Sequence, residues 1–105
     1  MNESDVLKGI VDNLKTQFDV KRVVLFGSRA RHTARDDSDF DILAIVESDI
    51  PYRRRQGVAR AAVDMIETVE LDLIVLTPNE LARSMMRFDS VARFAMEEGS
   101  VLYAA

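Results

Sequence analysis

The stretch Val24-Leu25-Phe26-Gly27-Ser28-Arg29-Ala30-Arg31 decides the fold, together with Asp39-Phe40-Asp41 eight residues later. The first segment predicts an apolar strand that ends at a Gly-Ser turn and continues into a basic helix. The second places two carboxylates at the start of another apolar run, residues 42–46. A Gly-Ser turn before a helix suits an anion, and paired carboxylates suit a cation. Together they predict a site for a metal-chelated triphosphate.

Length and composition limit the classes of protein that fit. With 105 residues we expect a single domain over residues 1–105. No run approaches the roughly 20 apolar residues that span a bilayer, the N-terminus lacks a secretory pattern, and there is no cysteine. We therefore expect a cytoplasmic protein without membrane contact. The net charge of -4 argues against direct nucleic-acid binding, whereas the basic segment 21–35 suits a small polyanion such as a nucleotide.

Helical and strand patterns alternate along the chain. The spacing of apolar residues predicts helices over 3–17, 29–34, 51–67 and 88–98, and one that begins at Thr77. Apolar and β-branched runs predict strands over 20–26, 39–47, 71–76 and 101–103. This order predicts an α/β (α+β) domain with a small mixed β-sheet flanked by helices.

Asp39 and Asp41 lie on one face of their predicted strand, with Cα atoms about 6.5–7 Å apart. Carboxylates this close repel each other unless a positive charge lies between them, and Mg²⁺ favours carboxylate and phosphate oxygens. The alternative is a strand end where both acids face water. That alternative suits Asp39 better than Asp41, which is followed at once by the apolar run.

Asp72 is the third acid of interest because it interrupts the apolar run Leu71 to Leu76. We expect it to be buried, where an unpaired carboxylate would be costly. A shared metal ion or a salt bridge to an arginine would compensate its charge. Glu70 is the rival on the same face, and we prefer Asp72 because Glu70 lies nearer the strand start, where solvation is easy.

These residues resemble the nucleotidyltransferase superfamily of DNA polymerase beta. In that superfamily a Gly-Ser before a short helix, an Asp-x-Asp on the next strand and a third Asp on a later strand hold a magnesium nucleotide. The likeness rests on Phe26 to Arg31, Ser38 to Asp41 and Asp72, and it extends to the end of the chain. Length and order resemble the minimal nucleotidyltransferase (MNT) branch, whose members are encoded beside HEPN-domain proteins. One departure is His32, where family members usually carry glycine.

The resemblance implies a polymerase-beta-like core that transfers AMP from ATP to an acceptor hydroxyl and releases pyrophosphate. Asp39, Asp41 and Asp72 would be the catalytic residues and the ligands of two Mg²⁺ ions, and Asp72 would also help to deprotonate the acceptor. The nucleotide would be bound by Gly27, Ser28, Arg29 and Arg31. The glycine and serine would hold the β- and γ-phosphates, and one of the two arginines would neutralise developing charge.

The partner is also implied by the resemblance. The chain has little room for an acceptor domain, so the acceptor would arrive on another protein. In MNT/HEPN pairs the MNT protein is an antitoxin that places AMP on a tyrosine of the HEPN ribonuclease toxin, in a homo- or hetero-oligomer. Two alternatives stay open: a non-catalytic antitoxin that acts by binding alone, and a small-molecule nucleotidyltransferase that works as a homodimer.

Two further patches are weaker signals. Arg53-Arg54-Arg55 is interpreted as a solvated helix start, with contact to a partner or RNA as the alternative. A set of soft apolar residues in the C-terminal part is suited to a partner surface, although packing against the sheet explains most of it more simply: Met85, Met86, Phe88, Phe94 and Met96.

Overall fold

The computed structural model describes residues 2–31, 39–64, 66 and 70–105. The elements along the described chain are α1 (Glu3–Gln17), β1 (Asp19–Phe26), β2 (Phe40–Glu47), α2 (Tyr52–Val63), β3 (Leu71–Leu76), α3 (Pro78–Met85), α4 (Val91–Glu98) and β4 (Ser100–Ala104). Within this part of the chain, no helix has the length and apolar character needed to cross a membrane.

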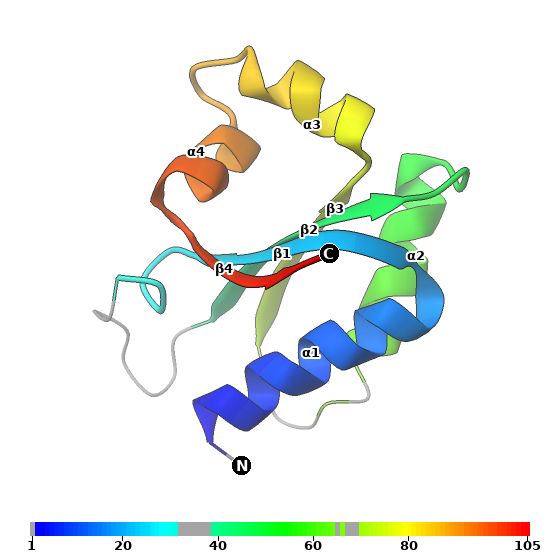
Figure 1. Cartoon of the computed structure of the whole chain (residues 1–105), viewed down its shortest axis with the longest axis vertical. Helices are drawn as coiled ribbons and strands as arrows, with labels where there is room; N and C mark the ends of the chain where they lie inside the picture. The colour runs from blue at the N-terminus through cyan, green and yellow to red at the C-terminus, as the bar shows by residue number, and fades with distance from the viewer. Residues whose placement is uncertain (1, 32–38, 65, 67–69) are drawn as a thin grey trace.

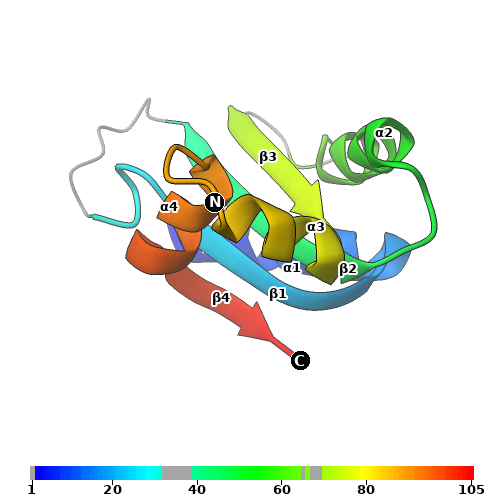
Figure 2. The same cartoon turned by 90° about the horizontal axis from the view of Figure 1, so that it is seen from above.

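The strands form one mixed sheet in the order β3-β2-β1-β4. β1 pairs antiparallel with both β2 and β4, whereas β2 and β3 are parallel. Helices α1 and α2 cover one face of the sheet, and α3 and α4 cover the other (Figures 1 and 2). The predicted fold class, a small mixed sheet flanked by helices, is confirmed.

β2 lies between β1 and β3 and is buried on both faces, as its sequence predicts. Ile42 and Ala44 belong to the core beneath α1 and α2, whereas Leu43 and Ile45 belong to the core beneath α3 and α4. Because successive side chains of a strand alternate between faces, Asp41 shares the α3/α4 face of the sheet. The carboxylate of Asp41 therefore lies on the face of the sheet that is covered by the two shorter helices, α3 and α4.

Side chains of α2 satisfy the open edge of β3. Gln56 accepts a hydrogen bond from the Val75 N–H (2.5 Å) and donates to the Leu73 carbonyl (2.9 Å). Arg60 donates to the Leu71 carbonyl at 2.7 Å. These bonds pair edge groups that would otherwise be open to another strand, and they fix β3 relative to α2.

Arg55 is buried, with only 2% of its surface exposed. Its guanidinium donates to the carbonyls of Ile50 and Val75 and to both carboxylate oxygens of Glu80. Glu80 also accepts a hydrogen bond from the Thr77 N–H at 2.9 Å and so completes the capping box of α3. The interpretation of this arginine as part of a solvated helix start is therefore wrong, because α2 begins against the junction of β3 and α3.

Two predicted helices differ from the structure. The segment after β1 forms a hydrogen-bonded turn as far as Arg31, and the rest of the predicted helix, residues 32–34, lies outside the described residues. The last helix begins at Val91, later than predicted, because the Ser90 hydroxyl accepts the Arg93 N–H at 3.2 Å and caps it.

The apolar residues of the C-terminal part divide into two groups. Met96 packs against the core as predicted, and Phe94 makes an edge-to-face contact with Phe26 at 6.4 Å between ring centroids. Met86 and Phe88, however, are 84% and 93% exposed. Packing against the sheet is therefore the wrong explanation for these two residues, since they lie in and beside the connection between α3 and α4, away from the sheet.

Candidate active site

The turn after β1 depends on Gly27. Its φ of 74° lies in the left-handed region, which glycine adopts without steric cost. The Arg31 N–H donates to the Gly27 carbonyl at 3.2 Å and closes the turn. A Cβ atom on Gly27 would collide with Oδ2 of Asp41 and lie 3.1 Å from its Cγ. The missing side chain therefore permits both the turn and the close approach of the Asp41 carboxylate to it.

Asp41 and Asp72 meet across two neighbouring strands. They are direct partners in the register of β2 and β3, so their carboxyl groups can share a hydrogen bond when one of them is protonated. Burial raises the pKa of Asp41, and the hydrogen bond and negative charge of Asp72 raise it further. Two carboxylates in this arrangement need either a shared proton or a cation.

Asp72 is exposed, so the prediction that it is buried is wrong. β3 is an edge strand, and Asp72 is its second residue, at the end where it is open to solvent. Within the described part of the chain, Asp72 forms no salt bridge to an arginine. Its partner is the carboxylate of Asp41.

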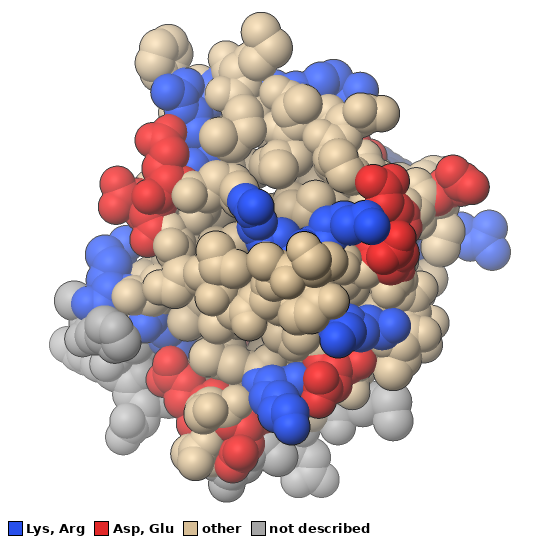
Figure 3. Space-filling model, viewed as in Figure 1, with Lys and Arg blue, Asp and Glu red and all other residues tan. Residues whose placement is uncertain are grey.

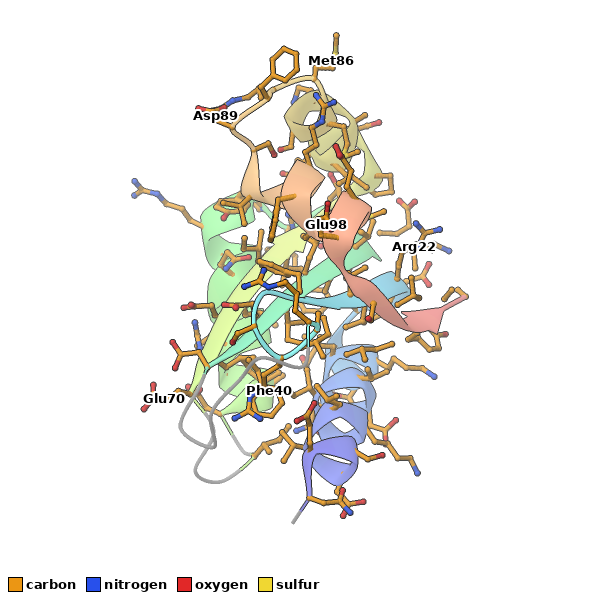
Figure 4. All side chains as sticks on the ribbon, turned by 90° about the vertical axis from the view of Figure 1, so that its left-hand side faces the viewer. Arg22, Phe40, Glu70, Met86, Asp89 and Glu98 are labelled. Atoms are coloured by element: carbon orange, nitrogen blue, oxygen red, sulfur yellow. The ribbon has the colours of Figure 1, made fainter. Side chains whose placement is uncertain are left out.

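Glu70, the rival for the third position, lies just outside β3. Its carbonyl accepts a hydrogen bond from the Phe40 N–H at 2.9 Å. Its side chain is exposed and points away from the body of the molecule (Figure 4). The structure therefore brings Asp72, rather than Glu70, to Asp41.

Asp39 lies immediately before β2 and is exposed. Its charge contributes to the raised pKa of Asp41, so the two carboxylates interact. Among the described residues, however, no three acidic, histidine or cysteine side chains lie close enough to form a metal-binding group. The predicted trio is thus represented by a close pair, Asp41 and Asp72, with Asp39 beside it.

The two arginines of the turn have different surroundings. The guanidinium of Arg29 stacks 4.0 Å from the Phe40 ring centroid and forms a 3.2 Å ion pair with Glu3 of α1. Arg31 is exposed, and its positive charge lowers the pKa of Asp41, opposing the effect of the neighbouring acids. The charge of Arg31 therefore reaches the Asp41 carboxylate. Ser28 lies in the turn itself, and His32 lies outside the described residues.

The donor set fits a magnesium nucleotide. Mg²⁺ is bound by carboxylate and phosphate oxygens, and the like-charged pair of Asp41 and Asp72 gains most from a divalent cation. Backbone N–H groups of a glycine turn next to that pair suit phosphate oxygens. The site thus combines oxygen donors for a metal with a turn for an anion.

A groove along β3 was missed by the sequence interpretation. It has a volume of about 580 Å³ and lies between β3, α3 and the start of α4. Ile74 and Leu76 form part of its wall. The alternation of β3 places these side chains on the same face as Asp72, and this period-two pattern was the signal available in the sequence.

The sequence of the chain matches the model of a known protein family. The model described as "Nucleotidyltransferase domain" matches residues 7–102, nearly the whole chain. The chain belongs to the nucleotidyltransferase domain family. The glycine turn and the paired aspartates therefore form the candidate active site of a nucleotidyltransferase.

Known proteins agree with this assignment. This chain is 32% identical over 110 residues to the "Putative protein adenylyltransferase MJ0604" of Methanocaldococcus jannaschii. The match covers 98% of this chain and 100% of the relative. The fold of this chain is similar to a chain in a toxin-antitoxin structure with AMP-PNP, with a TM-score of 0.67, 17% identity and coverage of 94% and 73% of the two chains. It is also similar to a chain in a complex of tri-AMPylated Shewanella oneidensis HEPN toxin with MNT antitoxin, with a TM-score of 0.63, 14% identity and coverage of 99% and 74%.

Proposed function

We propose that this nucleotidyltransferase transfers AMP from ATP to a tyrosine hydroxyl of a HEPN-domain ribonuclease toxin and so acts as its antitoxin. The observation that carries the proposal is the meeting of Asp41 and Asp72 beside the Gly27 turn. The relative described as a protein adenylyltransferase supports AMP as the transferred group and a protein as acceptor. The AMPylated HEPN toxin found with an MNT antitoxin supports the partner. We assign the reaction to the cytoplasm, where ATP is available.

In the proposed reaction, the acceptor oxygen attacks the α-phosphorus of ATP. The new phosphorus–oxygen bond forms as the bond from the α-phosphorus to the β-bridging oxygen breaks, and pyrophosphate leaves. The proton of the hydroxyl passes to the carboxylate of Asp72, which is exposed and lies beside Asp41 on the neighbouring strand. Gly27 and Ser28 hold the β- and γ-phosphates, and Arg31 neutralises charge that develops on the leaving group.

Two Mg²⁺ ions are part of the proposal. Asp39, Asp41 and Asp72 would hold them together with phosphate oxygens. When bound, magnesium supplies positive charge that neutralises the triphosphate and polarises the α-phosphoryl group. The like charges of Asp41 and Asp72 support this assignment, because a cation relieves their repulsion.

A binding-only antitoxin is the second candidate. The exposed Met86 and Phe88 favour a protein contact that needs no chemistry. The retained pair of carboxylates beside the glycine turn favours the enzyme, since contact alone needs no such pair. The two functions differ in whether AMP appears on the toxin.

The test is incubation with ATP labelled at the α-phosphate, Mg²⁺ and the product of the neighbouring gene. We expect label on that protein, lost when Mg²⁺ is chelated and lost in Asp41→Asn and Asp72→Asn. Glu70→Gln is the matched control, because it removes a nearby carboxylate that points away from the site (Figure 4). Label that persists in Asp41→Asn would contradict the proposed chemistry. Neutralisation of the toxin without any label would favour the binding-only antitoxin.

A further inference from the structure

We propose that the groove between β3, α3 and α4 binds the segment of the partner protein that carries the acceptor hydroxyl. The inference rests on the proposed function and adds to it the place on this chain where the acceptor segment lies. It also names the chemistry of that segment: apolar side chains beside an acidic one.

The order of the strands separates the two substrates. The Gly27 turn follows β1, Asp41 begins β2 and Asp72 begins β3, and these strands are neighbours in the sheet. A nucleotide whose phosphates lie at the β1 turn therefore has the carboxylates on its β3 side. The acceptor must approach the α-phosphorus from the side opposite the leaving pyrophosphate. The β3 side of the sheet is where the acceptor is expected.

The groove begins at Ile74 on that side. Ile74 lines the groove and is the next residue after Asp72 on the same face of β3, about 7 Å along the strand. Leu76 continues the wall, and Val91 of α4 contributes from above. A chain lying along these side chains passes directly beside the Asp72 carboxylate. The floor is apolar and suits apolar side chains of the acceptor segment.

The charge of the groove favours an acidic residue in that segment. Glu80 is neutralised by Arg55, and Arg87 forms an ion pair with Asp89 at 3.6 Å. The side chain of Arg83 forms no ion pair or hydrogen bond with any residue that the structure describes. Its guanidinium is therefore the unbalanced charge of the lining, and a carboxylate of the partner complements it.

The rim of the groove favours a protein over a small molecule as acceptor. Arg87 and Asp89 line the groove and flank Phe88, which is 93% exposed. Met86 and Asp89 point outward at the same end of the molecule (Figure 4). Figure 3 shows the opposite face of the molecule, on the β4 side of the sheet, where acidic and basic side chains are interspersed with uncharged ones. A groove that continues into an exposed apolar surface is typical of a protein contact.

The test measures kinetics of AMP transfer to the neighbouring gene's product for Arg83→Glu and Val91→Glu. We expect the KM for that protein to rise about tenfold or more, while the Kd for ATP stays within about twofold of wild type. Arg22→Glu is the matched control, because it makes the same charge change on β1 (Figure 4) and lies outside the groove. Retained ATP binding also shows that the variants are folded.

Each other outcome overturns the inference. A higher Kd for ATP with an unchanged KM for the protein would indicate that the groove binds the nucleotide base and not the acceptor segment. Unchanged values of both would show that the acceptor lies elsewhere. No transfer by the wild-type chain would instead refute the proposed function, so the two failures are distinguishable. As a second measurement, a photo-crosslinking residue at position 87 should capture the partner peptide that carries AMP, and capture of an unrelated peptide would contradict the inference.

Discussion

Asp41 and Asp72 are direct partners across the parallel strands β2 and β3, and the carboxyl group of Asp72 lies close enough to raise the pKa of Asp41. Each acid is the second residue of its strand, and the later side chains on the same face enter the core, so the backbone at both positions is fixed by the sheet. This arrangement keeps two negative charges together at a cost in stability. The cost is expected at a functional site, where stability and activity conflict.

Removing one charge of the pair should stabilise the metal-free protein. We expect Asp41→Asn to raise Tm by about 4 °C at pH 7 in EDTA. Because the pKa of Asp41 is raised, the cost of its ionised form is present at neutral pH and disappears as pH falls through that pKa. The difference between variant and wild type should therefore shrink in acid. Calorimetry between pH 3 and pH 8 checks this, and an unchanged or lowered Tm at pH 7 would contradict it.

Substitution by alanine should lower the unfolding free energy at Gly27 and raise it at Gly57. Gly27→Ala places a methyl group against the Asp41 carboxylate at a positive φ, so we expect a loss of about 2 kcal/mol in unfolding free energy and weaker ATP binding. Gly57 lies within α2, where an added Cβ meets nothing within 4 Å. Gly57→Ala should gain about 0.5–1 kcal/mol. Urea unfolding of both variants makes the comparison, and equal effects would show that the Gly27 contact is unimportant.

Substitution of Arg31 should affect mainly the rate of AMP transfer, whereas substitution of Arg29 should affect mainly the stability of the fold. Arg31 acts on Asp41 by charge, so Arg31→Ala should lower kcat for AMP transfer about tenfold to a hundredfold with Tm nearly unchanged. Arg29 stacks on Phe40 and pairs with Glu3, so Arg29→Ala should lower Tm by a few degrees. Transfer kinetics and calorimetry on both variants check this pair. The reverse assignment of effects would mean that Arg29 is the one near the phosphates.

The ion pair between buried Arg55 and partly exposed Glu80 should dominate the acid sensitivity of the fold. The hydrogen bond from Arg55 lowers the pKa of Glu80 below its ordinary 4.5. A lowered pKa contributes stability that is present above the ordinary value and lost as pH falls through the lowered one. In Glu80→Gln the unfolding free energy should therefore fall less steeply with decreasing pH below about pH 4.5. Arg55→Met should cost about 3 kcal/mol at pH 7, since it leaves a carboxylate unpaired.

The sequence predicted the ranges of the strands well because apolar periodicity and the Gly-Ser turn are local signals, whereas it gave no strand order. It predicted the convergence of Asp41 and Asp72 through the resemblance, but it gave the wrong environment for Asp72. An apolar run indicates a buried strand without indicating whether that strand is central or at an edge. The burial of Arg55 was missed for a similar reason. Its partner Glu80 is 25 residues away, and no local pattern links them.

The rate of a single turnover of AMP transfer to the partner protein tests the central claim most directly. It should be measured for Asp41→Asn, Asp72→Asn and the double variant. If the two acids act as one unit, each single substitution lowers the rate about a thousandfold or more, and the double variant is little slower than either. An Asp72→Asn enzyme that keeps a rate within about tenfold of wild type would contradict the account.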